Sequence, residues 1–242
     1  MFDEKNEDCL ENLNDGSLEK FADKGFNKLK SVTPHIPLGI VSPDELIKIA
    51  EIAKKYNAVL RITSSQTISL SGLSEDDRDL VRSELEFLNR KKRKRNSEEQ
   101  FVLKSFQSVK TCRGKEFCRR GKQNALTLGL KIDNIFYGTN LPSKLRVAVS
   151  GCPFSCSEPI IRDIGIVGTN NGYNFFVGGN ASTKPRFGIL FKENLTENCV
   201  LEYINAIVNF LIKYNSKKRL GEIIDIIGLD EFEKEIQNEI TK

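Results

Sequence analysis

The sequence contains no long hydrophobic run. None of its apolar stretches approaches the roughly eighteen consecutive apolar residues that a membrane-spanning helix requires. The acidic start, Met1-Phe2-Asp3-Glu4, also lacks the basic and apolar regions of a signal peptide. We therefore expect a soluble, cytoplasmic protein without a membrane partner.

A strong excess of either charge is also missing. The 37 Lys and Arg residues against 33 Asp and Glu leave a net charge of +4, which is too small to indicate a nucleic-acid partner. Six consecutive positive charges occur at 90–95, but no aromatic residues are interleaved with them as single-strand-binding surfaces require. This run is interpreted as a solvated linker, a docking site for an acidic electron donor, or a contact for a polyanionic cofactor.

Six cysteines are present, and in a reducing cytosol they are not expected to form a disulfide framework. Four of them occur as two close pairs, which indicates a metal site, because thiolates select zinc or iron–sulfur clusters and four match the ligand count of a 4Fe-4S cube. Cys199 is interpreted as a buried structural thiol in a helix, and Cys9 receives no role. The paired cysteines are Cys112 with Cys118, whose five-residue gap is wider than zinc sites usually have, and Cys152 with Cys156.

The amino-terminal part shows the element order of a small α+β unit. Ser42, Pro43 and Glu45 have the pattern of a capping box at the start of a helix. After a polar lead-in at 1–30, we expect residues 31–88 to resemble half of a ferredoxin-like domain. The expected elements are a strand at 36–41, a helix from 42 to 56, strands at 58–63 and 67–70, and a helix capped by Ser74.

The remainder of the chain carries the cysteine pairs. We expect residues 89–98 to form a basic linker and residues 99–242 to form a second α+β domain that ends in helices. An apolar strand is expected at 145–149, directly before the second cysteine pair. Thr196 stands where it can cap the first of the carboxy-terminal helices, which we interpret as covering a core or forming a dimer contact.

The cysteine pairs belong to a longer series of motifs. C-x5-C ends at Cys118, and after a gap of 33 residues Cys152 begins the second pair, within S-G-C-P-x-S-C. This series resembles the sirohaem-dependent sulfite and nitrite reductases over roughly residues 30–190. The other matching segments are 37–39, 61–67, 141–146, 162–168, 170–172 and 176–179.

The resemblance implies a sirohaem whose iron shares a cysteine sulfur with a 4Fe-4S cluster. By its position in the motif, Cys156 would be that bridge, and Cys112, Cys118 and Cys152 would be the other cluster ligands. A polycarboxylate cofactor and a small oxyanion substrate both require clustered Arg and Lys donors. The first candidates for holding sirohaem are Arg113, Lys115 and Arg119. Alternatively, these residues form a solvated basic helix face together with Arg120 and Lys122. Gly178 and Gly179 are further candidates, and they alternatively close a hairpin.

Four side chains are candidates for binding and protonating the substrate. Lys144 and Arg146 match the paired basic residues of the family, and Arg61 opens its R-x-T-x-x-Q segment. Such cations would fix the anion and polarise its oxygens as electrons arrive. His35, the single histidine, is interpreted either as a further proton donor or as a turn or packing residue.

We therefore expect an anaerobic-type sulfite reductase that makes sulfide with electrons from an external donor such as a ferredoxin. Nitrite reduction to ammonia is the close alternative, and a non-catalytic iron–sulfur relay is the alternative of a different class. Arg61, Lys144 and Arg146 favour the enzyme, because a relay needs no cations in a pocket. Only one copy of the family's half-repeat is found, so the site would need either a homodimer or a reduced single-copy pocket.

Overall fold

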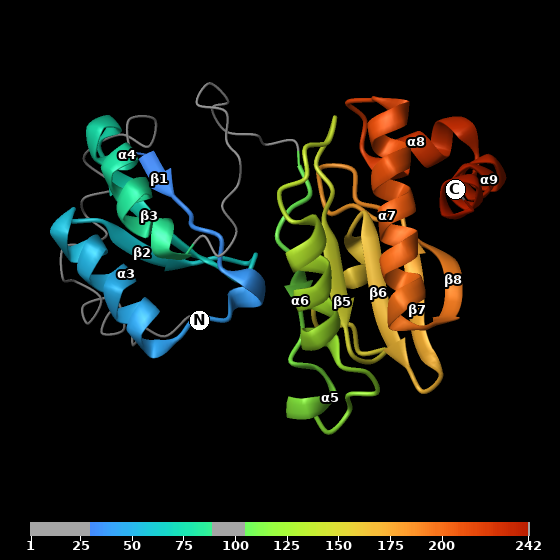
Figure 1. Cartoon of the computed structure of the whole chain (residues 1–242), viewed down its shortest axis with the longest axis horizontal. Coiled ribbons are helices and arrows are strands. Elements are labelled where there is room, and N and C mark those ends of the chain that lie inside the picture. Colours follow the sequence, from blue (N-terminus) through green and yellow to red (C-terminus); the bar gives the residue numbers. More distant parts are fainter. Residues whose placement is uncertain (1–29, 89–104, 242) are drawn as a thin grey trace, which may run out of the picture. The chain divides into compact units, whose positions relative to one another are not determined.

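The structure is a computed structural model, and it describes residues 30–88 and 105–241. The chain divides into two compact units, Met1–Lys92 and Arg93–Lys242 (Figure 1), and each is described here by itself. The predicted lead-in, Cys9 and the basic run at 90–95 lie outside the described residues. The helices and strands within each unit confirm the predicted α+β class.

The first unit is a three-stranded antiparallel sheet with two helices. The strand order is β1-β3-β2. Ile49, Leu70, Leu73 and Val81, from both helices and the central strand, are fully buried and form the centre of the core. The elements are β1 (Lys30–Val32), α3 (Pro43–Lys55), β2 (Val59–Ile62), β3 (Ile68–Leu73) and α4 (Glu75–Glu84), with short 3-10 turns η2 (Pro37–Gly39) and η3 (Leu85–Leu88).

The prediction of a strand at 36–41 is wrong. A single 3-10 turn, η2, occupies its centre, and the first strand, β1, lies earlier in the chain. Pro37 has no backbone N–H to donate to a sheet, and Leu38 and Gly39 have φ angles of 54° and 74°, which no strand adopts. Ile36, Pro37 and Leu38 are buried at this turn, whereas Ile40 is exposed.

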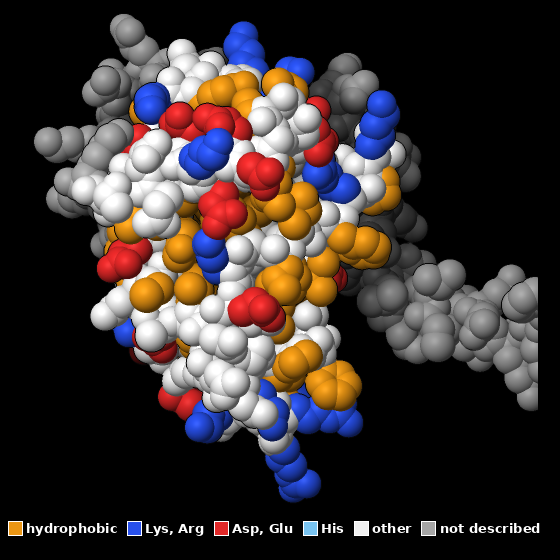
Figure 2. All heavy atoms as spheres, turned by 90° about the vertical axis from the view of Figure 1, so that its right-hand side faces the viewer, with side chains coloured by type: hydrophobic (Ala, Val, Ile, Leu, Met, Phe, Trp, Pro, Cys, Tyr) orange, Lys and Arg blue, Asp and Glu red, His pale blue; other side chains and the backbone are white. Residues whose placement is uncertain are grey.

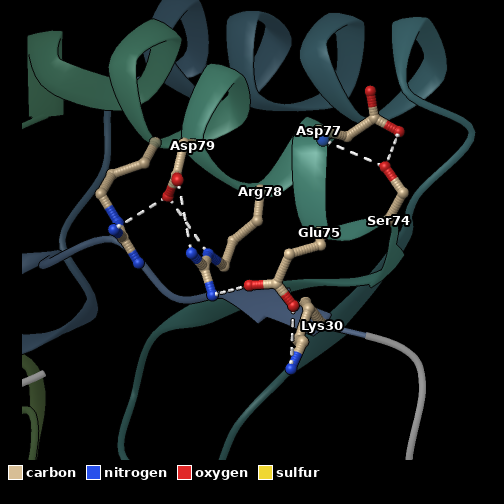
Figure 3. Close-up of polar contacts among 7 residues, drawn as sticks. Lys30, Ser74, Glu75, Asp77, Arg78 and Asp79 are labelled. Carbon is tan, nitrogen blue, oxygen red and sulfur yellow. Dashed lines mark hydrogen bonds and ion pairs between the residues drawn. The ribbon is translucent and has the colours of Figure 1, made fainter. Parts of the chain in front are cut away.

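Both predicted helix starts are confirmed. Ser42 accepts a hydrogen bond from the Glu45 N–H at 3.2 Å, and its own N–H donates to the Glu45 carboxylate at 2.8 Å. At the second helix the Ser74 hydroxyl accepts from the Asp77 N–H at 3.0 Å. Figure 3 shows how Glu75, in the first turn of α4, also pairs with Lys30 of β1 at 3.0 Å. These contacts fix the start of α4 against the edge of the sheet.

The second unit has a five-stranded mixed sheet in the order β4-β5-β6-β7-β8. Strands β4, β5 and β6 are parallel, and β6, β7 and β8 are antiparallel. The strands are β4 (Lys110–Thr111), β5 (Val147–Ser150), β6 (Ile164–Thr169), β7 (Gly172–Val177) and β8 (Ile189–Leu195). The helices are α5 (Gly114–Phe117), α6 (Ala125–Phe136), α7 (Glu197–Tyr214), α8 (Leu220–Ile227) and α9 (Leu229–Ile240), with a 3-10 turn η4 (Pro159–Ile161).

Different parts of the chain cover the two faces of this sheet. Helices α6 and α7 lie on one face (Figure 1), where Phe175 of β7 contacts Tyr203 of α7. The segment 151–161, which connects β5 to β6 and contains η4, lies on the other face, since the Ser157 hydroxyl reaches Ser150 of β5. The second cysteine pair belongs to this connecting segment.

Each of the carboxy-terminal helices, α7, α8 and α9, buries apolar side chains in the second unit. The Thr196 hydroxyl accepts from the Cys199 N–H at 3.3 Å, so the predicted cap of α7 is confirmed, and Cys199 is half-buried rather than buried. On the side of the second unit shown in Figure 2, acidic, basic and hydrophobic side chains are intermixed. None of the helices in the described ranges has the length and apolar character needed to span a bilayer.

Candidate functional site

The two cysteine pairs begin at the ends of two neighbouring strands. Strands β4 and β5 are parallel, and Thr111 pairs with Val149. Cys112 directly follows β4, and Gly151 and Cys152 directly follow β5. The carboxyl ends of adjacent parallel strands meet at one edge of a sheet, so residues 40 positions apart in the sequence are brought together at that edge.

The two cysteine loops, one after β4 and one after β5, each direct a backbone N–H group at Cys112. The Cys112 Sγ accepts hydrogen bonds from the Gly151 N–H at 3.1 Å and from the Gly114 N–H at 3.4 Å. Hydrogen bonds to a cluster sulfur are one of the means by which a protein sets the cluster's reduction potential. This arrangement suits a thiolate ligand better than a thiol, which is itself a donor.

Glycine is required where the loops cross. A Cβ on Gly151 would lie 2.6 Å from the Gln123 carbonyl oxygen, and one on Gly168 would lie 2.6 Å from the Gly151 carbonyl oxygen. Both distances are shorter than any van der Waals contact allows, and the opposing atoms are backbone. The close approach of the two loops therefore depends on these glycines.

The second cysteine loop is held by two serines that sequence reasoning missed. The Ser157 N–H donates to the Ser150 hydroxyl at 3.2 Å, and the Ser157 hydroxyl donates to the Val149 carbonyl at 2.8 Å. Both serines are buried. In the sequence, Ser150 and Ser157 flank the second cysteine pair. Their positions were a signal of this role, because small hydroxyl side chains often form hydrogen bonds with nearby backbone groups.

All four paired cysteines are free thiols, and their exposure differs. Cys152 is buried, Cys112 and Cys118 are half-buried, and Cys156 is exposed. Within the described ranges, no three His, Cys, Asp or Glu side chains converge on a single ion. Four thiolates match the ligand count of a 4Fe-4S cube, and the N–H groups that reach Cys112 suit a negatively charged ligand sulfur, so the donor set and its N–H partners fit a cluster.

Lys144 and Arg146 are half-buried and lie just before β5. The Arg146 N–H donates to the Asp163 Oδ2 at 2.8 Å. Burial lowers the pKa of Arg146, and the nearby guanidinium groups of Arg219 and Arg162 lower it further. An arginine keeps its charge under such conditions, so this region has an excess of positive charge that favours an anion.

A buried carboxylate organises this basic region. Asp163 is fully buried and accepts from Arg219 through Nε at 3.0 Å and Nη2 at 2.5 Å. Burial raises the pKa of Asp163, while the bonds from Arg219 and from the Arg146 N–H oppose that rise. Sequence reasoning missed both residues, since the only local signal was the Arg-Asp pair before β6.

The remaining cofactor candidates fall into two groups. Gly178 and Gly179 are buried, and a Cβ on Gly179 would meet the Ile160 carbonyl oxygen at 2.4 Å, so protein packing explains that glycine and its cofactor role stays a prediction. The basic residues Arg113, Lys115 and Arg119 are exposed around the first cysteine pair. Their neighbour Arg120 stacks over the Phe154 ring of the second cysteine loop, 4.4 Å from its centroid.

The candidates of the first unit lie on two of its segments. Arg61 is exposed on β2 and pairs across the sheet with Ser69, on the face opposite to buried Leu70. His35 is half-buried just before η2. The segment around it is fixed to the loop after β2, because the Thr67 hydroxyl donates to the Pro34 carbonyl at 2.9 Å.

Comparisons with known proteins identify both units. The family described as "Nitrite and sulphite reductase 4Fe-4S domain" matches residues 104–242, which is more than half of the chain. The chain belongs to the nitrite and sulfite reductase family. The family's "ferredoxin-like half domain" matches residues 24–88, as predicted for the amino-terminal unit. The family and its members imply sirohaem and a 4Fe-4S cluster as cofactors, also as predicted.

The relatives of the chain include proteins named as sulfite reductases and proteins named as nitrite reductases. It is 30% identical to "Sulfite reductase, assimilatory-type" of Nitratidesulfovibrio vulgaris over 83% of this chain and 88% of that protein. It is 34% identical to "Nitrite reductase [NAD(P)H]" of Bacillus subtilis over 82% of this chain, but only 24% of that protein. The comparisons support sulfite or nitrite reduction without deciding between them.

Solved structures show the same fold. The "Structure of Mycobacterium tuberculosis NirA protein" has a TM-score of 0.72 at 17% identity and covers 88% of this chain and 40% of that chain. The "Crystal structure of dissimilatory sulfite reductase I (DsrI)" has a TM-score of 0.70 at 11% identity, covering 86% of this chain and 69% of that chain. The chain thus spans less than half of the first of these two proteins.

Proposed function

We propose that the chain is a sulfite reductase that reduces sulfite to sulfide by six electrons from an external donor such as a ferredoxin. The observation that carries this proposal is the similarity to an assimilatory-type sulfite reductase, which is 30% identical to the chain and is covered over 88% of its length. Nitrite reduction to ammonia is the second candidate, supported by the 34% identity to the Bacillus protein.

In this proposal the cysteine loops bind the redox centre. Cys112, Cys118, Cys152 and Cys156 would hold the 4Fe-4S cluster, and Cys156, the exposed member, would also help to hold the sirohaem. When bound, sirohaem and the cluster would carry the electrons for reduction of a small anion. The Gly114 and Gly151 N–H groups stabilise negative charge on Cys112 and would help to set the reduction potential of the cluster.

The basic residues bind the substrate and supply protons. Arg146 keeps a fixed charge and orients an oxyanion through its planar fork of donors. Lys144 can lose a proton as well as carry charge, so it is the better proton donor to an oxygen that leaves as water. Arg61, which is exposed on β2, is a further hydrogen-bond donor to the anion. His35 is a further proton source.

The test is reduction by chemically reduced viologen under anaerobic conditions. The cluster-containing, sirohaem-loaded chain is given sulfite or nitrite in parallel, and sulfide and ammonia are quantified. We expect sulfide formation with the higher kcat/KM. Faster ammonia formation would assign the chain as a nitrite reductase, and turnover of neither anion by protein with an intact cluster would favour the electron relay.

Lys144→Met and Arg146→Met test the substrate residues. Each should lower kcat by roughly 100-fold, the effect of removing one oriented oxyanion donor, with the cluster and sirohaem absorbance retained. The matched control is Lys131→Met on α6, an exposed lysine whose ammonium pairs with Glu197 at 2.5 Å. Wild-type turnover in both site variants would exclude Lys144 and Arg146 from the substrate site.

A further inference from the structure

A second charged cluster lies beside the cysteine loops. The Glu158 Oε2 accepts from the Lys110 Nζ at 3.0 Å and from the Arg162 Nη2 at 2.9 Å. Glu158 follows Cys156 by two residues, and Lys110 precedes Cys112 by two. Lys110 pairs with Ala148 of β5, so its side chain leaves the sheet on the face that segment 151–161 covers. The cluster therefore borders both cysteine loops.

The binding fork of Arg162 is only half occupied. An arginine binds a carboxylate most strongly through two parallel N–H bonds, and the neighbouring Arg219 does so, giving Nε and Nη2 to the two oxygens of Asp163. Arg162 gives Nη2 to Glu158, but its Nε is buried and has no hydrogen-bond partner in the described part of the chain. A buried donor without a partner is costly, so a second acceptor is called for at this position.

Burial within the cluster is uneven. The side chains of Lys110 and Arg162 are each 17% exposed, whereas that of Glu158 is 53% exposed. Glu158 also has a left-handed backbone, with φ 58° and ψ 45°, which is unfavourable for a residue with a side chain. The two cations are thus fixed by the fold, while the carboxylate that meets them can turn into solvent at little cost.

We infer that Lys110 and Arg162 form a binding site for a peripheral carboxylate of the tetrapyrrole, and that Glu158 occupies this site until the cofactor displaces it. The inference rests on the proposed function, because it requires a polycarboxylate macrocycle bound beside Cys156. A propionate or acetate group would accept from both Nε and Nη2 of Arg162 and from Lys110. The released Glu158 carboxylate would be hydrated.

The test is the affinity of the cluster-containing chain for sirohaem, measured by absorbance titration without turnover. Arg162→Met and Lys110→Met should each weaken binding roughly 10- to 100-fold, the effect of losing one charge-assisted contact. Arg162→Lys, which keeps the charge but not the fork, should fall between Arg162→Met and the wild type. Lys131→Met is the control and should bind as the wild type does.

Glu158→Gln separates this role from a structural one. If Glu158 competes with the cofactor, its neutral variant should bind sirohaem severalfold more tightly. If Glu158 serves only to tie the loops together, the variant should bind more weakly or lose cluster iron, and the inference is then overturned. Metal-free uroporphyrin, a polycarboxylate, should show the same order of variants by fluorescence quenching, and mesoporphyrin, with far fewer carboxylates, should show smaller differences.

The outcomes also distinguish this inference from the proposed function. Equal sirohaem affinity in the wild type, Arg162→Met and Lys110→Met would remove the carboxylate site and leave the reductase proposal intact. Absence of sirohaem binding by the wild-type chain with its cluster in place would overturn both. Should Arg162→Met fail to fold by circular dichroism, the increased affinity expected of Glu158→Gln still decides the question.

Discussion

Replacing Cys112 or Cys152 by serine will remove the 4Fe-4S cluster. A serine hydroxyl is a harder and far less acidic ligand than a thiol, so it cannot replace a thiolate on iron. Cys112 also accepts two backbone N–H bonds, and Cys152 is buried, so neither position can recruit an outside ligand easily. The expected result is loss of nearly all cluster iron, acid-labile sulfide and visible absorbance in anaerobically purified protein, with loss of sulfite reduction.

Cys199→Ser provides the matched control. Cys199 is a free, half-buried thiol in the first turn of α7, so its replacement removes one thiol of the same chain without touching the cysteine loops. This variant should keep the iron content and spectrum of the wild type. Normal iron content in Cys112→Ser and Cys152→Ser would show that these residues are not cluster ligands, and equal loss in Cys199→Ser would indicate general instability.

Local signals predicted the elements of the first unit well where a side chain binds its own backbone. The caps at Ser42 and Ser74 lie where they were expected, because capping depends on residues three positions apart. The strand predicted at 36–41 failed, since apolar character alone does not distinguish a buried turn from a strand. Pro37 and Gly39 were the contrary signals, and the backbone angles of Leu38 and Gly39 decided the outcome.

In the candidate site, too, local patterns were predictable from the sequence, whereas contacts between distant residues were not. Spacing singled out the cysteine pairs as candidate ligands, because metal ligands cluster in the sequence as well as in space, and their ligand role stays a prediction. It could not show that Cys112 and Gly151 are hydrogen-bonded neighbours, which follows from the parallel pairing of β4 with β5. The ion pair of Asp163 with Arg219 joins residues 56 positions apart, and no periodic pattern marks such a partner.

Asp163→Ala should lower the free energy of unfolding of the second unit by about 3–5 kcal/mol. The change leaves the Arg219 guanidinium without its carboxylate partner and removes the acceptor of the Arg146 N–H. Breaking one side of a buried ion pair has this large effect because the other charge remains desolvated. Urea unfolding followed by tyrosine fluorescence is a suitable measurement, since the chain has no tryptophan and four of its five tyrosines lie after residue 93.

The double variant separates pairing from simple loss of charge. If Asp163 and Arg219 act as a pair, Arg219→Met should restore part of the stability that Asp163→Ala removes, because no unpaired guanidinium is left. Lys234→Met, which breaks an exposed pair with Glu231, should change stability by less than about 1 kcal/mol. A similarly small loss in Asp163→Ala would mean that solvent readily reaches this carboxylate when the sheet and α8 move apart. The position of Arg146 would then depend on β5 alone, and the substrate role proposed for Arg146 would not require the ion pair of Asp163 with Arg219.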